Sequence, residues 1–250
     1  MNASVQFPHA AGLTLPDFLG IGAQKAGTSW LHANLKTHPG VFVPVPKELH
    51  FFDRRFEEGW EAYGRAFAPA GSRIKGEITP AYGILPPHRV AVIAEAMPRL
   101  KVIFLMRNPI ERAWSQALMN LAYQPGRAPQ SVGDGEIIAH FHSSPSRMRG
   151  DYEAILKTWL GHFDRRQVFV GFYEDVKNRP RQLLGEVFSF LGLKGDLDFS
   201  AFPCDEVIHG GAGVAMPMRF RRILLEIYQE PIRRLGQLYG APAEKWLTLD

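Results

Sequence analysis

The chain has 250 residues, of which 46% are hydrophobic and 22% charged, a balance that is typical of a folded globular protein and excludes a disordered one. Its net charge of +4 is mildly basic. Basic and aromatic residues are not interleaved on one element, so nucleic-acid binding is not favoured. The single cysteine, Cys204, excludes an internal disulfide. No apolar run reaches the roughly 18 residues of a membrane span and the amino-terminal stretch does not resemble a signal peptide, so we expect a cytoplasmic protein without a transmembrane segment.

Strands and helices alternate along the chain. Apolar runs predict strand-like segments at residues 17–22, 73–82, 101–107 and 167–173. Helical patterns are expected at residues 28–38, 87–97, 151–163, 180–191 and 218–239, with one further helix that starts at Pro109. Such alternation predicts an α/β fold with a central, mostly parallel sheet that is flanked by helices in three layers.

The remaining segments read as loops within one domain that spans residues 1–250. Residues 1–16 are expected to form a flexible amino-terminal arm, and residues 194–216 an irregular loop region. Residues 124–148 contain Gly, Pro and Ser and read as a long polar connection, mobile or facing the substrate. In a parallel sheet ligands bind beyond the carboxyl ends of the strands, so we expect the site among the residues that directly follow each strand.

The stretch "FLGIGAQKAGTSWLHANL" (residues 18–35) has the pattern of a phosphate-binding loop. Gly22 and Gly27 are five residues apart, after an apolar strand and before a helix, and such a turn presents backbone N–H groups and the positive end of a helix dipole to an anion. A nucleoside-triphosphate loop would place a lysine directly after the second glycine. Here Thr28 holds that position, and the lysine of the loop is Lys25.

A second candidate for anion binding is "FLMRNPIERAWSQALMN", where Arg107 ends a buried strand. A charge there is costly without a partner, and the guanidinium group is shaped to hold a phosphate in two places. Ser115 follows about two helical turns later and can share the same helix face. Arg107 could instead pair with Glu111 or cap a neighbouring helix, and these alternatives stay open.

Together these stretches resemble the sulfotransferases that use 3′-phosphoadenylyl sulfate (PAPS), whose fold is P-loop-like. The resemblance runs over residues 17–193 in the right order and includes "PKELHFFD" and "GEITPAY", which are similar to the branch of the heparan-sulfate and many bacterial enzymes. It implies that the first motif binds the 5′-phosphosulfate, that an Arg and a Ser bind the 3′-phosphate, and that no metal is required. The cofactor-binding residues would then be Lys25, Ala26, Gly27, Thr28, Ser29, Trp30, Arg107, Ser115 and Arg149.

The resemblance also implies a mechanism. A sulfonate group would pass in line from PAPS to a hydroxyl, less readily an amine, of a small-molecule, lipid or glycan acceptor, and adenosine 3′,5′-bisphosphate (PAP) would be the product. Lys25 would stabilise the charge on the leaving phosphate, and Glu48 would be the base. His50 is the rival base, or it orients Glu48. Phe51 and Phe52 would shape the acceptor pocket or belong to the core.

Two positions depart from the family pattern. Some relatives carry a lysine directly after the glutamate of "GEITPAY", where this chain has Ile78 after Glu77, and Glu77 itself reads as a supporting or plain strand residue. The expected carboxyl-terminal phosphate loop, residues 209–213, contains no Lys or Arg, and Arg219, Arg221 and Arg222 are candidates to replace it. Two other functions remain as alternatives, a P-loop-type small-molecule kinase and a non-catalytic nucleotide-binding module.

Overall fold

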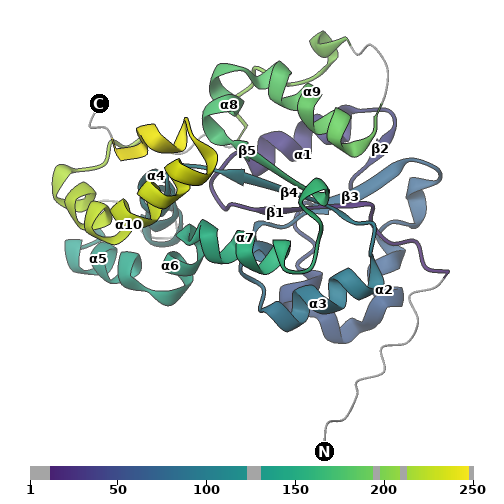
Figure 1. Ribbon diagram of the computed structural model, residues 1–250, viewed down its shortest axis with the longest axis horizontal. Helices are drawn as coiled ribbons and strands as arrows, with labels where there is room; N and C mark the ends of the chain where they lie inside the picture. Colours follow the sequence, from purple (N-terminus) through teal and green to yellow (C-terminus); the bar gives the residue numbers. More distant parts are fainter. Residues whose placement is uncertain (1–11, 123–130, 194–197, 209–212, 248–250) are drawn as a thin grey trace, which may run out of the picture.

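A single parallel sheet forms the centre of the computed structural model, which describes residues 12–122, 131–193, 198–208 and 213–247 (Figure 1). Its strands lie in the order β2-β3-β1-β4-β5, and each neighbouring pair is parallel. They are β1 (Phe18–Gly22), β2 (Val41–Phe42), β3 (Ile74–Ile78), β4 (Lys101–Met106) and β5 (Val168–Phe172). The predicted α/β fold with a parallel central sheet is therefore confirmed.

Helices cover both faces of the sheet (Figure 1). One face carries α1 (Thr28–Thr37), α8 (Tyr173–Asn178) and α9 (Pro180–Leu191). The other face carries α2 (Gly59–Arg65), α3 (Pro87–Ala96) and α7 (Tyr152–Leu160). Four further helices gather beyond the carboxyl end of β4: α4 (Pro109–Ala117), α5 (Asp134–His142), α6 (Ser144–Gly150) and α10 (Met218–Tyr239). In this group α10 packs against α4 and α5 and also reaches α7.

The sheet packs tightly because its central strands are apolar on both faces. In β4 each residue from Val102 to Met106 is fully buried. β1 and β3 approach so closely that a Cβ on Gly76 would lie 2.4 Å from the Phe18 carbonyl oxygen, so only glycine fits there. This continuous apolar character is what the sequence showed at residues 101–107, and it fixes the strand ends that hold the polar residues described below.

The prediction of a long polar connection at residues 124–148 is wrong for most of its length. Residues 123–130 lie outside the described part of the chain, but α5 and α6 occupy most of residues 134–150. The helical turn spacing of Ile137 and Phe141 places both side chains in the core, and Pro145 stands in the first turn of α6, where its missing N–H costs nothing. The polar composition of the segment belongs to the exposed faces of these two short helices.

The expected amino-terminal arm and the expected loop at residues 194–216 are described only in part. Residues 1–11 of the expected arm lie outside the described residues, while Leu13 and Leu15 pack on the core. Residues 198–208 and 213–216 contain one short 3-10 turn, Phe199–Ala201, and no longer helix or strand. Across the described residues no helix is long and apolar enough to span a membrane. The cytoplasmic location stays a prediction, as does the single domain.

The described carboxyl-terminal segment is anchored at the carboxyl ends of β4 and β5. In the 3-10 helix η9 (Ala243–Leu247), the Trp246 carbonyl accepts a hydrogen bond from Asn108 Nδ2 at 3.0 Å, and its indole Nε1 donates to Glu174 Oε1 at 2.8 Å. The indole ring also packs against Tyr152 and Phe172. This turn therefore covers the carboxyl ends of the strands from which Arg107 emerges.

Candidate functional site

A pocket of about 860 Å³ lies at the carboxyl ends of the strands. After β1 the chain forms β2 and β3 on one side of β1, and β4 lies on its other side. Each of the β1, β3, β4 and β5 strand ends contributes to its wall, as the parallel topology predicts. The lining residues that the sequence singled out are Lys25, Gly27, Thr28, Ser29, Trp30, Glu48, Arg107 and Ser115. Residues 204–208 form a further part of the wall.

The turn between β1 and α1 leaves the first amides of α1 open toward this pocket. Gly27 has a φ of 84° and precedes the helix without any side-chain cap, so the amides of the first turn keep their hydrogen-bonding capacity. A side chain on Gly27 would meet Tyr173 and Val176 at 3.2 Å. Ala26 differs from its neighbours, because it is fully buried and its N–H bonds to the Ala23 carbonyl. Thr28 and Ser29 are thus the residues of this turn that offer donors to an anion.

Lys25 stands in this turn with a φ of 69°, an uncommon conformation for a residue with a side chain. Its ammonium group has no partner among the described residues. Burial, together with the positive charges of Arg107 and Lys47, lowers the pKa of Lys25. A half-buried cation beside two other cations gains most from a multiply charged anion, so the pocket is suited to bind one.

Arg107 leaves the end of β4 and braces the same turn. One of its guanidinium nitrogens donates to the Lys25 carbonyl at 2.9 Å, and the group lies over the Tyr173 ring, 4.7 Å from its centre. The Tyr152 hydroxyl fixes the Arg107 backbone through a 2.7 Å bond to its carbonyl oxygen. The expected alternative, a pair with Glu111, is also present at 3.9 Å. The Arg107 side chain is 19% exposed, and it lines the pocket.

Ser115 and Glu111 follow Arg107 on one face of α4, one turn apart. Ser115 lines the pocket, whereas Glu111 is held at 3.4 Å by Arg221 of α10. Arg219 of the same helix pairs with Asp134 instead. Of the three arginines proposed to replace a basic loop, Arg221 is therefore the one that shares the Glu111 carboxylate with Arg107. Residues 209–212 lie outside the described residues.

Arg149 does not line the pocket. It belongs to α6, donates to the Pro145 carbonyl at 2.9 Å, and has its pKa lowered by burial and by Arg112, while Asp53 raises it. The charges that act on it therefore include Asp53 of the "PKELHFFD" segment. Arg149 is therefore absent from the pocket wall that Ser115 lines, although the sequence had grouped the two residues.

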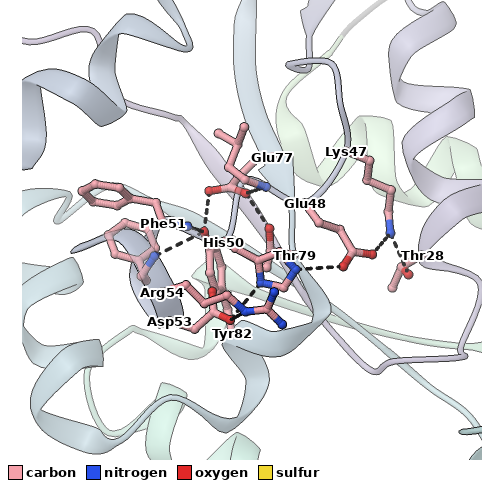
Figure 2. A network of polar contacts seen from close by, with 12 residues as sticks. Thr28, Lys47, Glu48, His50, Phe51, Asp53, Arg54, Glu77, Thr79 and Tyr82 are labelled. Carbon is pink, nitrogen blue, oxygen red and sulfur yellow. Dashed lines mark hydrogen bonds and ion pairs between the residues drawn. The ribbon is translucent and has the colours of Figure 1, made fainter. Parts of the chain in front are cut away.

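A chain of polar contacts links that segment to the β1–α1 turn (Figure 2). Lys47 Nζ contacts Glu48 Oε1 at 2.6 Å and Thr28 Oγ1 at 3.5 Å. On the other side, His50 Nε2 lies 3.4 Å from Glu48 Oε2, and His50 Nδ1 lies 2.8 Å from Asp53 Oδ2. Glu48 is thus placed between a lysine and a histidine that a second carboxylate orients. Sequence reasoning missed Asp53, although its spacing of three residues from His50 on a helical turn was a usable signal.

Phe51 and Phe52 belong to the core and do not form an apolar acceptor pocket. They are 3% and 2% exposed and lie in an aromatic cluster with Trp60, Tyr63 and Phe56. Phe51 stacks on Tyr63 with ring centres 4.3 Å apart. The apolar residues of "HFFD" therefore anchor the segment, while Lys47 and Glu48, which precede them, line the pocket.

Glu77 at the end of β3 is a buried acceptor for four donors, and Figure 2 labels two of the residues that supply them, Thr79 and Tyr82. Its Oε1 accepts from the Tyr63 and Tyr82 hydroxyls at 2.7 and 2.9 Å, and its Oε2 accepts from the Thr79 hydroxyl at 2.6 Å and the Leu49 N–H at 3.2 Å. Burial raises the pKa of Glu77, while these hydrogen bonds lower it. The pKa values of Tyr63 and Tyr82 are raised by burial and by Glu77. Both phenols therefore remain donors to the carboxyl group.

The fold is an α/β fold of the P-loop-like class, with a cation-rich pocket at the carboxyl ends of its strands. Residues 15–201 match the family model described as a sulfotransferase domain, and the chain belongs to the sulfotransferase family. It is therefore an enzyme that transfers sulfonate groups. Neither a P-loop kinase nor a non-catalytic binding module is supported by this match.

Known relatives agree with the family assignment. The human heparan sulfate glucosamine 3-O-sulfotransferase 6 is 30% identical over 96% of this chain and 79% of its own length. The chain spans about three fifths of the length of two further human 3-O-sulfotransferases, 3B1 and 3A1. Among solved structures, a sulfotransferase from Alicyclobacillus acidocaldarius is 26% identical with a TM-score of 0.69 over 93% of this chain and 99% of its own. The mouse sulfotransferase SULT7A1, solved with PAP, has the same fold at 16% identity, with a TM-score of 0.61 over 92% of this chain and 88% of its own.

Proposed function

We propose that this enzyme transfers a sulfonate group from PAPS to a hydroxyl group of a glycan. The observation that carries the proposal is a single pocket whose wall contains both the cation-rich β1–α1 turn and Glu48. A donor with several negative charges and an acceptor that must lose a proton need these two kinds of groups side by side. The glycan acceptor is supported by the names of the relatives, which act on heparan sulfate glucosamine.

The residues of the pocket fit such a donor. Its volume of about 860 Å³ suits a nucleotide. The amides of Thr28 and Ser29 and the unpartnered ammonium of Lys25 would hold the 5′-phosphosulfate, while Arg107 and Ser115 would hold the 3′-phosphate. Trp30, fixed by a 2.8 Å bond from its Nε1 to the Cys204 carbonyl, adds an aromatic wall for the base. Metal independence stays a prediction.

The donor supplies an activated sulfonate whose leaving group is a phosphate oxygen. Lys25 places a positive charge where negative charge develops on that oxygen, which stabilises the transition state more than the ground state. Glu48 accepts the proton of the acceptor hydroxyl. His50, held by Asp53, orients the Glu48 carboxylate, and Lys47 keeps the same carboxylate close to Thr28. We assign the role of base to Glu48 because it lines the pocket.

The donor part of the proposal is tested by melting curves. PAP at 100 times its dissociation constant should add about 2.7 kcal/mol of stability, and AMP or ATP with magnesium at the same concentrations should add less. Stabilisation by ATP with magnesium alone would contradict the donor assignment.

The acceptor part needs a separate assay with radiolabelled PAPS. We expect label in heparan sulfate and none in a phenol or a fatty alcohol supplied at equal concentration. Glu48→Gln is the matched blank, because it keeps the size and the polar character of the side chain while removing the base. Transfer to the phenol or the alcohol only would refute the glycan acceptor while leaving the donor assignment intact.

A further inference from the structure

The segment that carries Glu48 has an unusual backbone. Glu48 and His50 have φ values of 68° and 52°, so two residues with side chains adopt left-handed conformations on either side of Leu49. Such conformations are disfavoured for residues with a Cβ and persist only when surrounding contacts enforce them. The cause of this conformation must therefore be found in what the segment contacts.

The contacts that enforce it come from the end of β3 and from the 3-10 helix η4 (Pro80–Ile84) that follows it. The only backbone donor between the two left-handed residues, the Leu49 N–H, bonds to Glu77 Oε2 at 3.2 Å. The Phe51 and Phe52 N–H groups, which follow shortly after Leu49, donate to the Tyr82 hydroxyl at 2.8 and 3.4 Å. Tyr82 donates its own proton to Glu77 Oε1 at 2.9 Å. One carboxyl group thus holds the segment directly at Leu49 and, through a phenol, at its first helical turn.

The Glu77 carboxyl group is buried without a positively charged partner in the described part of the chain. Glu77 is 2% exposed, and within the described residues no Lys, Arg or His pairs with it. A buried carboxylate without a cation is tolerated only when hydrogen bonds satisfy it, and four donors do so here. Three of these donors, the hydroxyl groups of Thr79, Tyr63 and Tyr82, belong to residues that are themselves buried. The fourth donor, Leu49, belongs to the segment beside the pocket.

We propose that Glu77 is a positioning residue that, through the Leu49 N–H and the Tyr82 hydroxyl, fixes residues 47–52 so that Glu48 faces the donor pocket. The inference rests on the proposed role of Glu48 as base. In this proposal Glu77 and Tyr82 of "GEITPAY" act together to position the "PKELHFFD" segment. Neither side chain lines the pocket, so neither is a catalytic residue.

The decisive variant is Tyr82→Phe, which removes one oxygen and leaves the ring in place. The Phe51 and Phe52 N–H groups then lose their acceptor, and the segment is free to shift. Because small displacements of a catalytic group are expensive, we expect kcat to fall about 10- to 100-fold. The KM for PAPS and the melting shift produced by PAP should stay at the wild-type values, because the donor turn keeps its own contacts.

Tyr63→Phe is the matched control. Tyr63 donates to the same Glu77 oxygen at 2.7 Å, but its hydroxyl makes no bond to the backbone of residues 47–52. We expect its kcat to stay close to the wild-type value. Glu77→Gln is the second variant, because an amide offers one oxygen where the carboxylate offers two. Either orientation of the amide breaks one of the two links to the segment, so kcat should again fall without a change in the KM for PAPS.

Hydrogen exchange of peptides that cover residues 47–56 gives a readout that does not depend on turnover. Tyr82→Phe should speed exchange there, and Tyr63→Phe should not. Equal kcat values for the two Tyr variants, or faster exchange in Tyr82→Phe without a loss of kcat, would overturn the proposal. If Glu48→Gln itself keeps wild-type turnover, the proposed base is wrong, and the exchange comparison still decides whether Tyr82 and Glu77 hold the segment.

Discussion

Replacing Arg107 with alanine tests whether the pocket distinguishes a 3′-phosphorylated nucleotide from a plain one. In the structure the guanidinium group does two things that alanine cannot do. It donates to the Lys25 carbonyl at 2.9 Å, which braces the turn for the 5′ end of the donor, and it keeps further N–H groups for a phosphate. The two losses should act on different ligands.

The sizes of these losses follow from the contacts. The bond to the Lys25 carbonyl affects every ligand that uses the turn, and its removal should cost about 1 kcal/mol, or roughly fivefold in affinity. A charge-assisted contact to the 3′-phosphate contributes about 1.5–3 kcal/mol more, but only to PAP. PAP should therefore lose roughly 50- to 1000-fold in affinity, and AMP about fivefold.

Titration calorimetry of both nucleotides with wild-type and variant protein measures the two ratios. Arg107→Lys is the matched control, because it keeps the charge and cannot bond to the Lys25 carbonyl and a phosphate with one planar group. Its PAP affinity should lie between those of the wild type and Arg107→Ala. Equal losses for PAP and AMP in Arg107→Ala would show that Arg107 does not contact the 3′-phosphate. Melting curves of the ligand-free proteins check that the variants are folded.

Three other predictions use the same assays. Glu48→Gln should lower kcat by about 100- to 10,000-fold with unchanged PAP affinity, and retained turnover would exclude Glu48 as the base. The pKa of Lys25 is lowered from 10.5, so its charge and with it the PAP affinity should be complete near neutral pH, where the phosphates are also charged, and decline as the pH rises through a value below 10.5. In Lys25→Arg that decline should move to higher pH, and an identical pH profile would show that another group titrates. Arg221→Ala should weaken PAP binding about fivefold, because it leaves the Glu111 carboxylate to compete for Arg107, and the double variant with Glu111→Gln should regain the lost affinity. A double variant as weak as Arg221→Ala would place the effect elsewhere.

Much of the fold was readable because its signals are local. The apolar run at residues 101–107 predicted a buried strand, and Pro109 and Pro180 marked the starts of α4 and α9 where the structure has them. The turn at residues 22–29 was equally readable, since glycine spacing, a preceding strand and a following helix all lie within one short stretch. The failure at residues 124–148 has a physical reason as well. Helices as short as α5 and α6 have few buried residues, and their stability comes from contacts with α4 and α10 that a local pattern does not contain.

The site was readable in part. Lys25, Glu48 and Arg107 could be singled out because each belongs to a recognisable stretch, and all three line the pocket, while their roles stay predictions. Arg149 was grouped with them but does not line the pocket, and its position depends on how α6 packs, for which the local sequence carries no signal. The role of Glu77 was not readable, because it arises from a hydrogen bond to Leu49, which is 28 residues away in the chain. Backbone donors carry no sequence signal, so contacts of this kind emerge only from the folded structure.

The anchoring of Trp246 connects the carboxyl-terminal turn to the strand ends that carry Arg107. Its bonds to Asn108 and Glu174 span 138 and 72 positions of sequence, so they form only after both strands are in place. Coupling between sites is reciprocal: if the anchored turn supports the edge that holds the nucleotide, a bound nucleotide must in turn hold the turn in place. Resistance of residues 243–247 to limited proteolysis should therefore rise when PAP is bound. The same coupling makes η9 a sensitive place for an optical label that reports nucleotide binding.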